Sequence, residues 1–235
     1  MERIAFYGMR RSGNHAILNW LLCNLSQKKN IIRIKHRLVS SGNSCYLNAI
    51  NEYVNTKPKI LEIDFKFAEV SFKNIIVSYE DFPINYETKY TTNFQKIIVI
   101  RDINNLIASR LKKIKEDNEG KKMAKYLFNV NENFFKSWIT HASISRNEGY
   151  IIKFEEWISS KKIRDKISSD LGLKNIDYYQ SISSYGGGSS FSGTSKKPEV
   201  NELNNRWKEV EIDSDLKKII NSEEILKLRK LHGYI

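Results

Sequence analysis

A short turn bounded by two glycines, near the start of the chain, has the residue types of an anion-binding site. Residues 6–18 read Phe-Tyr-Gly-Met-Arg-Arg-Ser-Gly-Asn-His-Ala-Ile-Leu. The apolar residues before the turn predict a strand over 3–8, and the residues from Asn14 onward predict a helix. Gly8 and Gly13 let the backbone bend sharply, and the first amides of the helix have no intrahelical partners. These amides would bind an anion at the helix N-terminus.

The positions of the charges distinguish this turn from the phosphate loop of nucleoside triphosphate enzymes. In that loop a lysine and then a Ser or Thr follow the second glycine, where they neutralise the outer phosphates and hold Mg²⁺. Asn14 and His15 stand there instead, and the positive charge lies inside the loop on Arg10 and Arg11. Because a guanidinium grips two oxygens at once, we expect a phosphate-type anion with less charge than a triphosphate, bound without metal. The alternative is an ordinary strand-to-helix turn with surface arginines.

A second basic strand end follows at Arg101. Residues 96–100 read Lys-Ile-Ile-Val-Ile, which predicts a strand that is buried on both faces inside a parallel sheet. Ser109 comes eight residues after Arg101, in the next predicted helix. Ligands of open α/β sheets bind at the carboxyl ends of the strands, where Gly8 and Arg101 would both lie. Arg101 and Ser109 are therefore candidates for one phosphate, and the alternative is a surface pair of Arg101 and Asp102 that caps the helix.

The elements that must position these residues alternate between strand and helix. We expect strands near 3–8, 31–36, 74–79, 96–101 and 149–154. We expect helices over 14–25, over 103–146 with a break near Gly120, and in the C-terminal region with the apolar residues Leu216, Ile219, Ile220, Ile225, Leu228 and Leu231. This order predicts an α/β protein with a mainly parallel sheet covered by helices.

The loop segment resembles the 5′-phosphosulfate loop of sulfotransferases that use 3′-phosphoadenosine 5′-phosphosulfate (PAPS). Arg11, Ser12 and Gly13 match that loop, with arginine where many members have lysine, whereas Asn14 and His15 replace a pair of threonines. The resemblance implies a P-loop-like nucleotide-binding fold, a three-layer α/β sandwich with a central, mainly parallel sheet. It also implies that PAPS is the cofactor, with no metal. The cofactor-binding residues that it assigns to the loop are Arg10, Arg11, Ser12, Gly13, Asn14 and His15.

Three further segments extend the resemblance over nearly the whole chain. Arg101 and Ser109 are similar to the family's 3′-phosphate site. Phe154 stands where the family has an aromatic residue that could pack on adenine, although a core phenylalanine is an equal alternative. Residues 181–197 have the Gly and Ser composition of a flexible loop, but by their place in the chain they resemble the late cofactor-covering segment, which we interpret as a lid. The candidate 3′-phosphate contacts there are Ser190, Gly193, Lys196, Lys197 and Arg206.

The resemblance implies transfer of a sulfuryl group to an acceptor hydroxyl, on a glycan or a small metabolite. Arg11 and the loop amides would stabilise the charge on the departing phosphate oxygen. The strand over 74–79 runs into Glu80, where members of the family carry a His or Glu base, so Glu80 is the first candidate. His36 is the second, because an imidazole titrates near neutral pH.

Length and composition agree with one soluble enzyme domain over residues 1–235. The chain is 40% hydrophobic, and no stretch approaches the roughly 20 apolar residues that span a bilayer. The first predicted strand begins almost at Met1, which leaves no room for a signal segment, so we expect a cytoplasmic protein. Cys23 and Cys45 have no metal-type spacing and are expected to be buried thiols.

The formal net charge of +12 indicates a polyanionic partner or a basic surface. A non-enzymatic basic nucleic-acid-binding module is one alternative function, but the sequence has no zinc-finger spacing, RNA-binding aromatic signature or helix-turn-helix pattern. A P-loop kinase-like phosphotransferase is the other, and the missing lysine argues against it. We therefore expect a PAPS-dependent sulfotransferase without a nucleic-acid partner.

Overall fold

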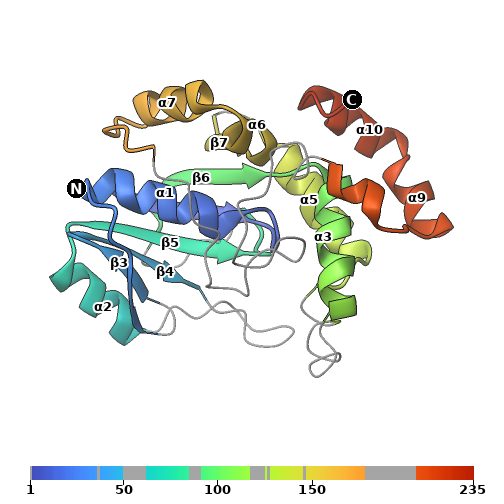
Figure 1. Cartoon of the computed structure of the whole chain (residues 1–235). Helices are drawn as coiled ribbons and strands as arrows, with labels where there is room; N and C mark the ends of the chain where they lie inside the picture. The colour runs from blue at the N-terminus through green and yellow to red at the C-terminus, as the bar shows by residue number, and fades with distance from the viewer. Residues whose placement is uncertain are drawn as a thin grey trace.

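The computed structural model of the chain describes residues 2–35, 38–49, 62–84, 91–116, 125, 128–144, 147–177 and 205–235. Seven strands form one sheet in the order β2-β3-β4-β5-β1-β6-β7 (Figure 1). The strands are β1 (Arg3–Gly8), β2 (Ile32–Lys35), β3 (Leu38–Ser41), β4 (Ser44–Asn48), β5 (Asn74–Glu80), β6 (Gln95–Ile100) and β7 (Tyr150–Lys153). The helices are α1 (Asn14–Ser26), α2 (Glu62–Ser71), α3 (Ile103–Glu116), α5 (Glu132–Ala142), α6 (Phe154–Ser159), α7 (Lys161–Asp170), the 3₁₀ helix η1 (Arg206–Glu209), α9 (Ser214–Ile220) and α10 (Glu223–Leu231).

The sheet is mostly parallel, as the sequence predicts. Strands β4, β5, β1, β6 and β7 pair in parallel, and β3 pairs antiparallel with both β2 and β4. In the register of the central strand β1, Gly8 lies beside Glu80 of β5 and Val99 of β6. The carboxyl ends of these three strands therefore meet at one edge of the sheet.

Both faces of the sheet are covered by helices. On β1, Ile4 and Phe6 belong to a core on one face, together with residues of α1, α6 and α7. Ala5 and Tyr7 belong to a core on the other face, which includes Phe65 of α2. Because side chains alternate along a strand, an apolar strand fills both cores, and the three-layer α/β sandwich expected from the sequence is confirmed. In Figure 1, α2 lies below the sheet and α6 and α7 lie above it.

A third apolar cluster lies beyond the carboxyl ends of the strands. It joins α3, α5, α9 and α10 and includes Met9 of the β1–α1 loop. Figure 1 shows these helices gathered at the side to which the arrows of β5 and β6 point. Met9 therefore anchors the loop in this helical group. No helix in the described ranges is long and apolar enough to span a bilayer.

The observed elements differ from the sequence prediction at three places. The hairpin of β3 and β4 falls in a stretch for which we predicted no strand, whereas α2 agrees with the predicted alternation of strand and helix, which gave it no bounds. In the predicted helical region over 103–146, the described residues include the separate helices α3 and α5. Phe154 is the first residue of α6 and not the last residue of a strand, and Glu155 and Glu156 in its first turn favour a helix start there.

Candidate functional site

The β1–α1 loop turns through two residues with positive φ. Arg11 has φ 75° and Gly13 has φ 83°, and the backbone N–H of Ser12 donates to the carbonyl oxygen of Met9 at 3.0 Å. A positive φ is uncommon for a residue with a side chain and marks a constrained position. Gly8 allows a close approach, since a Cβ there would lie 2.2 Å from Oδ1 of Asn14 and would displace that side chain. The bend expected from the two glycines is therefore present, with Arg11 at its centre.

The loop delivers the N-terminus of α1 without a cap. Gly13 is the N-cap residue and supplies no side-chain hydrogen bond, and the first turn of α1 contains no acidic residue. In the described part of the chain, neither Gly13 nor Asn14 donates its backbone N–H to a protein acceptor. The positive end of the helix dipole and these amides therefore suit an anion.

Asn14 joins the loop to Glu80 at the end of β5. Its side chain is 3% exposed, and Nδ2 donates to the carbonyl oxygen of Met9 at 3.1 Å and to Oε1 of Glu80 at 2.9 Å. Nε2 of His15 lies 3.9 Å from the same carboxylate oxygen. The structure thus brings the first candidate base to the cofactor loop that the sequence predicts.

Arg11 points toward α3. Its Nε donates to Oγ of Ser109 at 3.2 Å, so the first and second sequence-predicted sites are in contact. Burial lowers the pKa of Arg11 to about 10, and the neighbouring guanidinium groups of Arg101 and Arg110 act in the same direction. The carboxylates of Glu116 and Glu80 oppose this change. An anion bound among these guanidinium groups would reduce their mutual repulsion and stabilise their charged forms.

Arg101, like Arg110, is an almost fully buried cation of the cluster. Its side chain is 4% exposed, Nη1 donates to the backbone carbonyl oxygen of Arg11, and Nε lies 3.7 Å from Oε1 of Glu155. Burial lowers its pKa. Nη2 is buried and has no hydrogen-bond partner within the described ranges. An unpaired buried donor on a cation costs free energy, which an anion bound beside it would recover.

Phe154 packs in the core between the two arginine-bearing strand ends. The guanidinium carbon of Arg101 lies 4.9 Å from its ring centroid, and a Cβ on Gly13 would lie 2.1 Å from its Cε2 atom. The ring also stacks on Trp157 with centroids 6.2 Å apart. Phe154 thus contacts the loop itself, and its predicted stacking on adenine stays a prediction.

A network of buried charged residues, to which the sequence assigns no role in the site, surrounds Arg101. Asp102 accepts from Nε of Arg229 at 3.1 Å and from its Nη2 at 3.4 Å, and its backbone N–H donates to Glu155 at 3.2 Å. Burial raises the pKa of both Asp102 and Glu155. Trp138 of α5 donates to the carbonyl oxygen of Arg101 at 2.9 Å. Arg229 and Glu155 are distant from Asp102 in the sequence. No local motif therefore indicates these pairs, and their charge is the only signal in the sequence.

Some predicted site residues cannot be placed at this edge of the sheet. His36, Ser190, Gly193, Lys196 and Lys197 lie outside the described residues, and Arg206 begins η1 without a described side chain. The helix η1 lies on α3, because the backbone N–H of Trp207 donates to Oδ1 of Asn105 at 3.4 Å. These residues keep their predicted roles as hypotheses.

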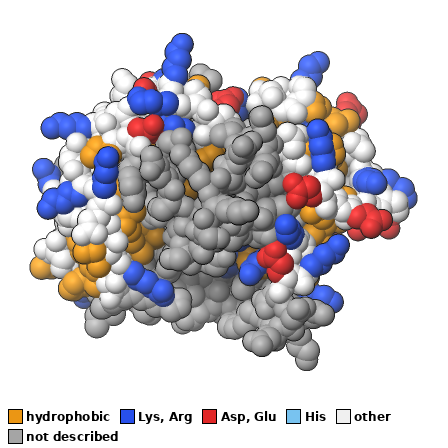
Figure 2. Space-filling view, viewed as in Figure 1, with side chains coloured by type: hydrophobic (Ala, Val, Ile, Leu, Met, Phe, Trp, Pro, Cys, Tyr) orange, Lys and Arg blue, Asp and Glu red, His pale blue; other side chains and the backbone are white. Residues whose placement is uncertain are grey.

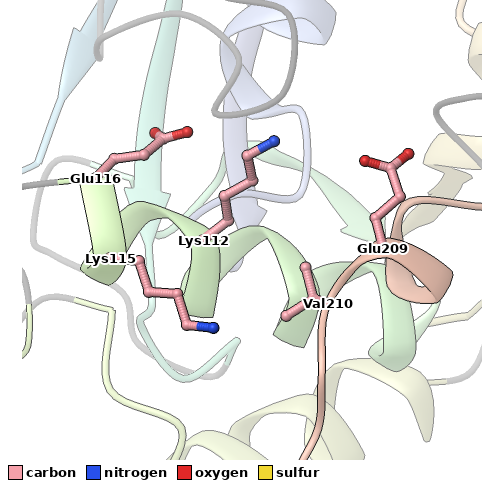
Figure 3. A pocket seen from close by; sticks show the side chains of 5 residues that line it. All are labelled: Lys112, Lys115, Glu116, Glu209 and Val210. Carbon is pink, nitrogen blue, oxygen red and sulfur yellow. The ribbon is translucent and has the colours of Figure 1, made fainter.

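A cavity of about 320 Å³ lies between α3 and the segment after η1. Lys112, Lys115, Glu116, Glu209 and Val210 line it. Figure 3 shows Lys112, Glu116 and Glu209 pointing to one side, whereas Lys115 points to the other. One lining residue, Glu116, acts on the β1–α1 loop through its charge, which raises the pKa of Arg11. The described side chains contain no group of three His, Cys, Asp or Glu residues that could hold a metal ion.

The fold is that of sulfotransferase domains. The sulfotransferase domain from the curacin biosynthetic pathway superimposes with a TM-score of 0.58 and 10% sequence identity, over 100% of this chain and 98% of that domain. The sulfotransferase domain from the olefin synthase of Synechococcus PCC 7002 superimposes with a TM-score of 0.54 and 9% identity, over 100% of this chain and 95% of that domain. The resemblance that the loop motifs indicate is thus confirmed at the level of the fold. The sequence matches no protein-family model and no curated protein.

Proposed function

We propose that this protein is a PAPS-dependent sulfotransferase that acts on an acceptor hydroxyl. The observation that carries the proposal is the contact between Arg101 and Arg11 at the ends of β6 and β1. Around that contact lie an uncapped helix N-terminus and a buried guanidinium nitrogen without a protein partner in the described part of the chain. These donors fit the two phosphate groups of an adenosine bisphosphate, one at the loop and one at Arg101 and Ser109.

Each chemical role has a residue at this edge of the sheet. PAPS supplies the sulfuryl group when it is bound. Arg11 and the amides of Gly13 and Asn14 stabilise the negative charge on the phosphate oxygen that departs, because fixed donors aimed at developing charge lower the barrier. Glu80, oriented by Asn14 at 2.9 Å, removes the proton from the acceptor hydroxyl. His36 remains the second candidate base.

The cavity beside α3 supports a polar acceptor. Four of its five lining residues are charged, two lysines and two glutamates. Their ammonium and carboxylate groups can exchange hydrogen bonds with the hydroxyl groups of an acceptor. We propose a hydroxyl-bearing acceptor, such as a carbohydrate, at this cavity. We propose further that residues 1–235 act as one cytoplasmic domain.

Calorimetry with 3′-phosphoadenosine 5′-phosphate (PAP), the desulfated product, tests the cofactor assignment. Wild-type protein is expected to bind PAP more tightly than ATP with magnesium. Arg11→Ala and Arg101→Ala are each expected to weaken PAP binding by about tenfold to a hundredfold, since a hydrogen bond to a charged group contributes about 1.5–3 kcal/mol. Arg3→Ala is the matched control, because Arg3 pairs with Glu69 at 3.9 Å on α2.

Two other outcomes would replace the proposal. Equal or preferred binding of ATP with magnesium would favour a P-loop kinase-like phosphotransferase. Retention on heparin or DNA that persists in Arg11→Ala and Arg101→Ala, without PAP binding, would favour a nucleic-acid-binding module. Figure 2 shows Lys and Arg side chains distributed over the visible face between acidic residues, an arrangement that gives no continuous basic stripe among the described residues of that face to favour nucleic acid.

A further inference from the structure

Asp81, the residue after the candidate base, joins β5 to the anion loop through its backbone and its side chain. Its backbone N–H donates to the carbonyl oxygen of Gly8 at 3.1 Å. Its Oδ1 accepts from the backbone N–H of Arg10 at 2.8 Å. One residue therefore holds the loop on both sides of Met9, immediately before the positive-φ residue Arg11.

The backbone of Asp81 is itself in an uncommon conformation. Its φ is 60°, in the left-handed region that few residues with a side chain adopt, although aspartate tolerates it better than most. Such a conformation is kept where surrounding contacts determine it. Here the turn directs the carboxylate back over the loop while the preceding residue, Glu80, reaches Asn14.

The carboxylate is anchored on its far side by Arg110 of α3. Nη2 of Arg110 donates to Oδ1 of Asp81 at 2.5 Å, and Nη1 donates to the carbonyl oxygen of Asn129 at 3.3 Å. The Arg110 guanidinium is 4% exposed and lies over the ring of Phe134, 4.7 Å from its centroid. Because these contacts fix Arg110, its ion pair with Asp81 holds the loop in a defined position relative to α3.

Asp81 also balances the charge beside Arg11. Its Oδ2 lies 3.8 Å from Nε of Arg10, and its carboxylate forms the ion pair with Arg110. Arg110 is in turn one of the cations that lower the pKa of Arg11. Loss of the carboxylate would leave these guanidinium groups repelling one another across the loop. The negative charge of Asp81 and its hydrogen bonds to the loop therefore both stabilise the same loop conformation.

We propose that Asp81 is a positioning residue, which with Arg110 fixes the Arg10–Arg11 segment in the conformation that receives the anion. Asp81 does not touch the cofactor in this proposal and acts through the backbone of Arg10. The expected effect on cofactor affinity rests on the proposed function, whereas the expected effect on loop order does not.

Two substitutions separate the contributions of Asp81. Asp81→Gly removes the carboxylate and keeps a residue that adopts positive φ without cost. Asp81→Asn keeps an acceptor oxygen for the Arg10 amide but removes the charge that pairs with Arg110. Gln27→Gly is the matched control, since Gln27 has φ 58° at the end of α1, away from the loop.

Hydrogen exchange of the Arg10 amide and calorimetry with PAP are the two measurements. In Asp81→Gly we expect exchange of this amide to be at least tenfold faster and PAP binding to be about tenfold to a hundredfold weaker. In Asp81→Asn we expect exchange close to that of wild type and an intermediate affinity, a partial rescue that a purely structural role would not produce. Gln27→Gly is expected to change neither measurement.

Each result decides between the two proposals. If the Arg10 amide of Asp81→Gly exchanges at the wild-type rate, the positioning role is overturned, whether or not PAP affinity changes. Absence of PAP binding to wild type would overturn the proposed function, and the exchange measurement would still decide the role of Asp81. If Asp81→Gly does not fold, Asp81→Asn replaces it: PAP affinity equal to that of wild type would then overturn the role.

Discussion

The ring of Phe154 and the backbone of Gly13 are in contact so close that no Cβ fits between them. A Cβ built on Gly13 would lie 2.1 Å from Cε2 and 2.3 Å from Cδ2 of the ring. Gly13 also occupies the N-cap position of α1, with φ 83° and no capping side chain. The N-terminus of α1, where we propose that the anion binds, is therefore placed by the contact between a residue without a side chain and the first residue of α6.

Gly13→Ala is expected to destabilise the protein by about 2–5 kcal/mol. Positive φ costs roughly 1–2 kcal/mol for a residue with a Cβ, and overpacking against the ring adds about 1–3 kcal/mol. Urea unfolding measures the change. Gly172→Ala is the control, because Gly172 has φ 66° but no atom within 4 Å of its built Cβ, so only the conformational cost is expected there.

The double variant Gly13→Ala with Phe154→Leu tests the contact directly. A smaller side chain leaves room for the added methyl group, so the two changes are expected to be less than additive by about 0.5–3 kcal/mol. Strict additivity would mean that the ring and the glycine are not in contact in solution.

Glu80→Gln is expected to keep cofactor binding and to lose turnover. The glutamine retains an acceptor oxygen for Nδ2 of Asn14, so PAP affinity should stay within about threefold of wild type, whereas loss of a general base lowers kcat by about 10²–10⁴-fold. Calorimetry and a sulfuryl-transfer assay with PAPS measure the two effects. Normal turnover in Glu80→Gln would transfer the role to His36.

Glu69→Gln serves as the control for this prediction. Glu69 lies on α2 and pairs with Arg3 near the start of β1, so the substitution changes the same charge away from the carboxyl ends of the strands. The kcat of this variant is expected to equal that of wild type.

The central strands and the sharp bend of the β1–α1 loop could be predicted because their signals are local. The strand residues around Ile98 are apolar on both faces, and the loop carries its glycines and arginines within a few residues. The contact of Arg11 with Ser109 follows from the sheet order, since both β1 and β6 end at one edge.

The hairpin of β3 and β4 was not predicted because its strands are rich in serine. Ser41 and Ser44 are fully buried, and their hydroxyls are satisfied by partners elsewhere: Ser26 lies 2.9 Å from Ser41, and Asn74 donates to Ser44 at 3.0 Å. The serines therefore give this buried strand pair a polar sequence pattern, which does not predict a buried strand. The turn residues Gly42-Asn43 were the one available signal for a hairpin.

The buried network behind Arg101 could not be predicted for a different reason. Arg229 and Asp102 are 127 residues apart, and no local pattern specifies that pairing. The role of Asp81 depends on its positive φ, which is a property of the folded chain. Long-range ion pairs and backbone conformation thus account for the part of the site that the sequence leaves open.

Cys23 and Cys45 are expected to be unreactive in the folded protein. Both are free and buried, and burial raises the pKa of Cys23 to about 11 and that of Cys45 to about 12. Since the thiolate is the reactive form, only about one thiol in a thousand or fewer is ionised at pH 8. Mass spectrometry after iodoacetamide should find no label on native protein and two labels in urea; rapid labelling of the native state would contradict this burial.

Glu155→Gln is expected to flatten the dependence of stability on pH. Burial raises the pKa of Glu155 above its ordinary value of 4.5, although Arg101 opposes this effect. Between 4.5 and the higher pKa of the folded state, the folded protein holds a proton that the unfolded chain has lost. The free energy of unfolding therefore falls as the pH rises through this window, by up to about 1.4 kcal/mol for each pH unit that the window spans.

Urea unfolding of wild type and Glu155→Gln from pH 4 to pH 8 measures this difference. The wild-type free energy of unfolding should decline more steeply above pH 4.5 than that of Glu155→Gln, because glutamine does not titrate. Glu156→Gln, which alters the exposed neighbour that pairs with Lys153, should keep the wild-type slope. Equal slopes in wild type and Glu155→Gln would contradict a raised pKa at Glu155 and would mean that Arg101 or water offsets the effect of burial on this carboxylate.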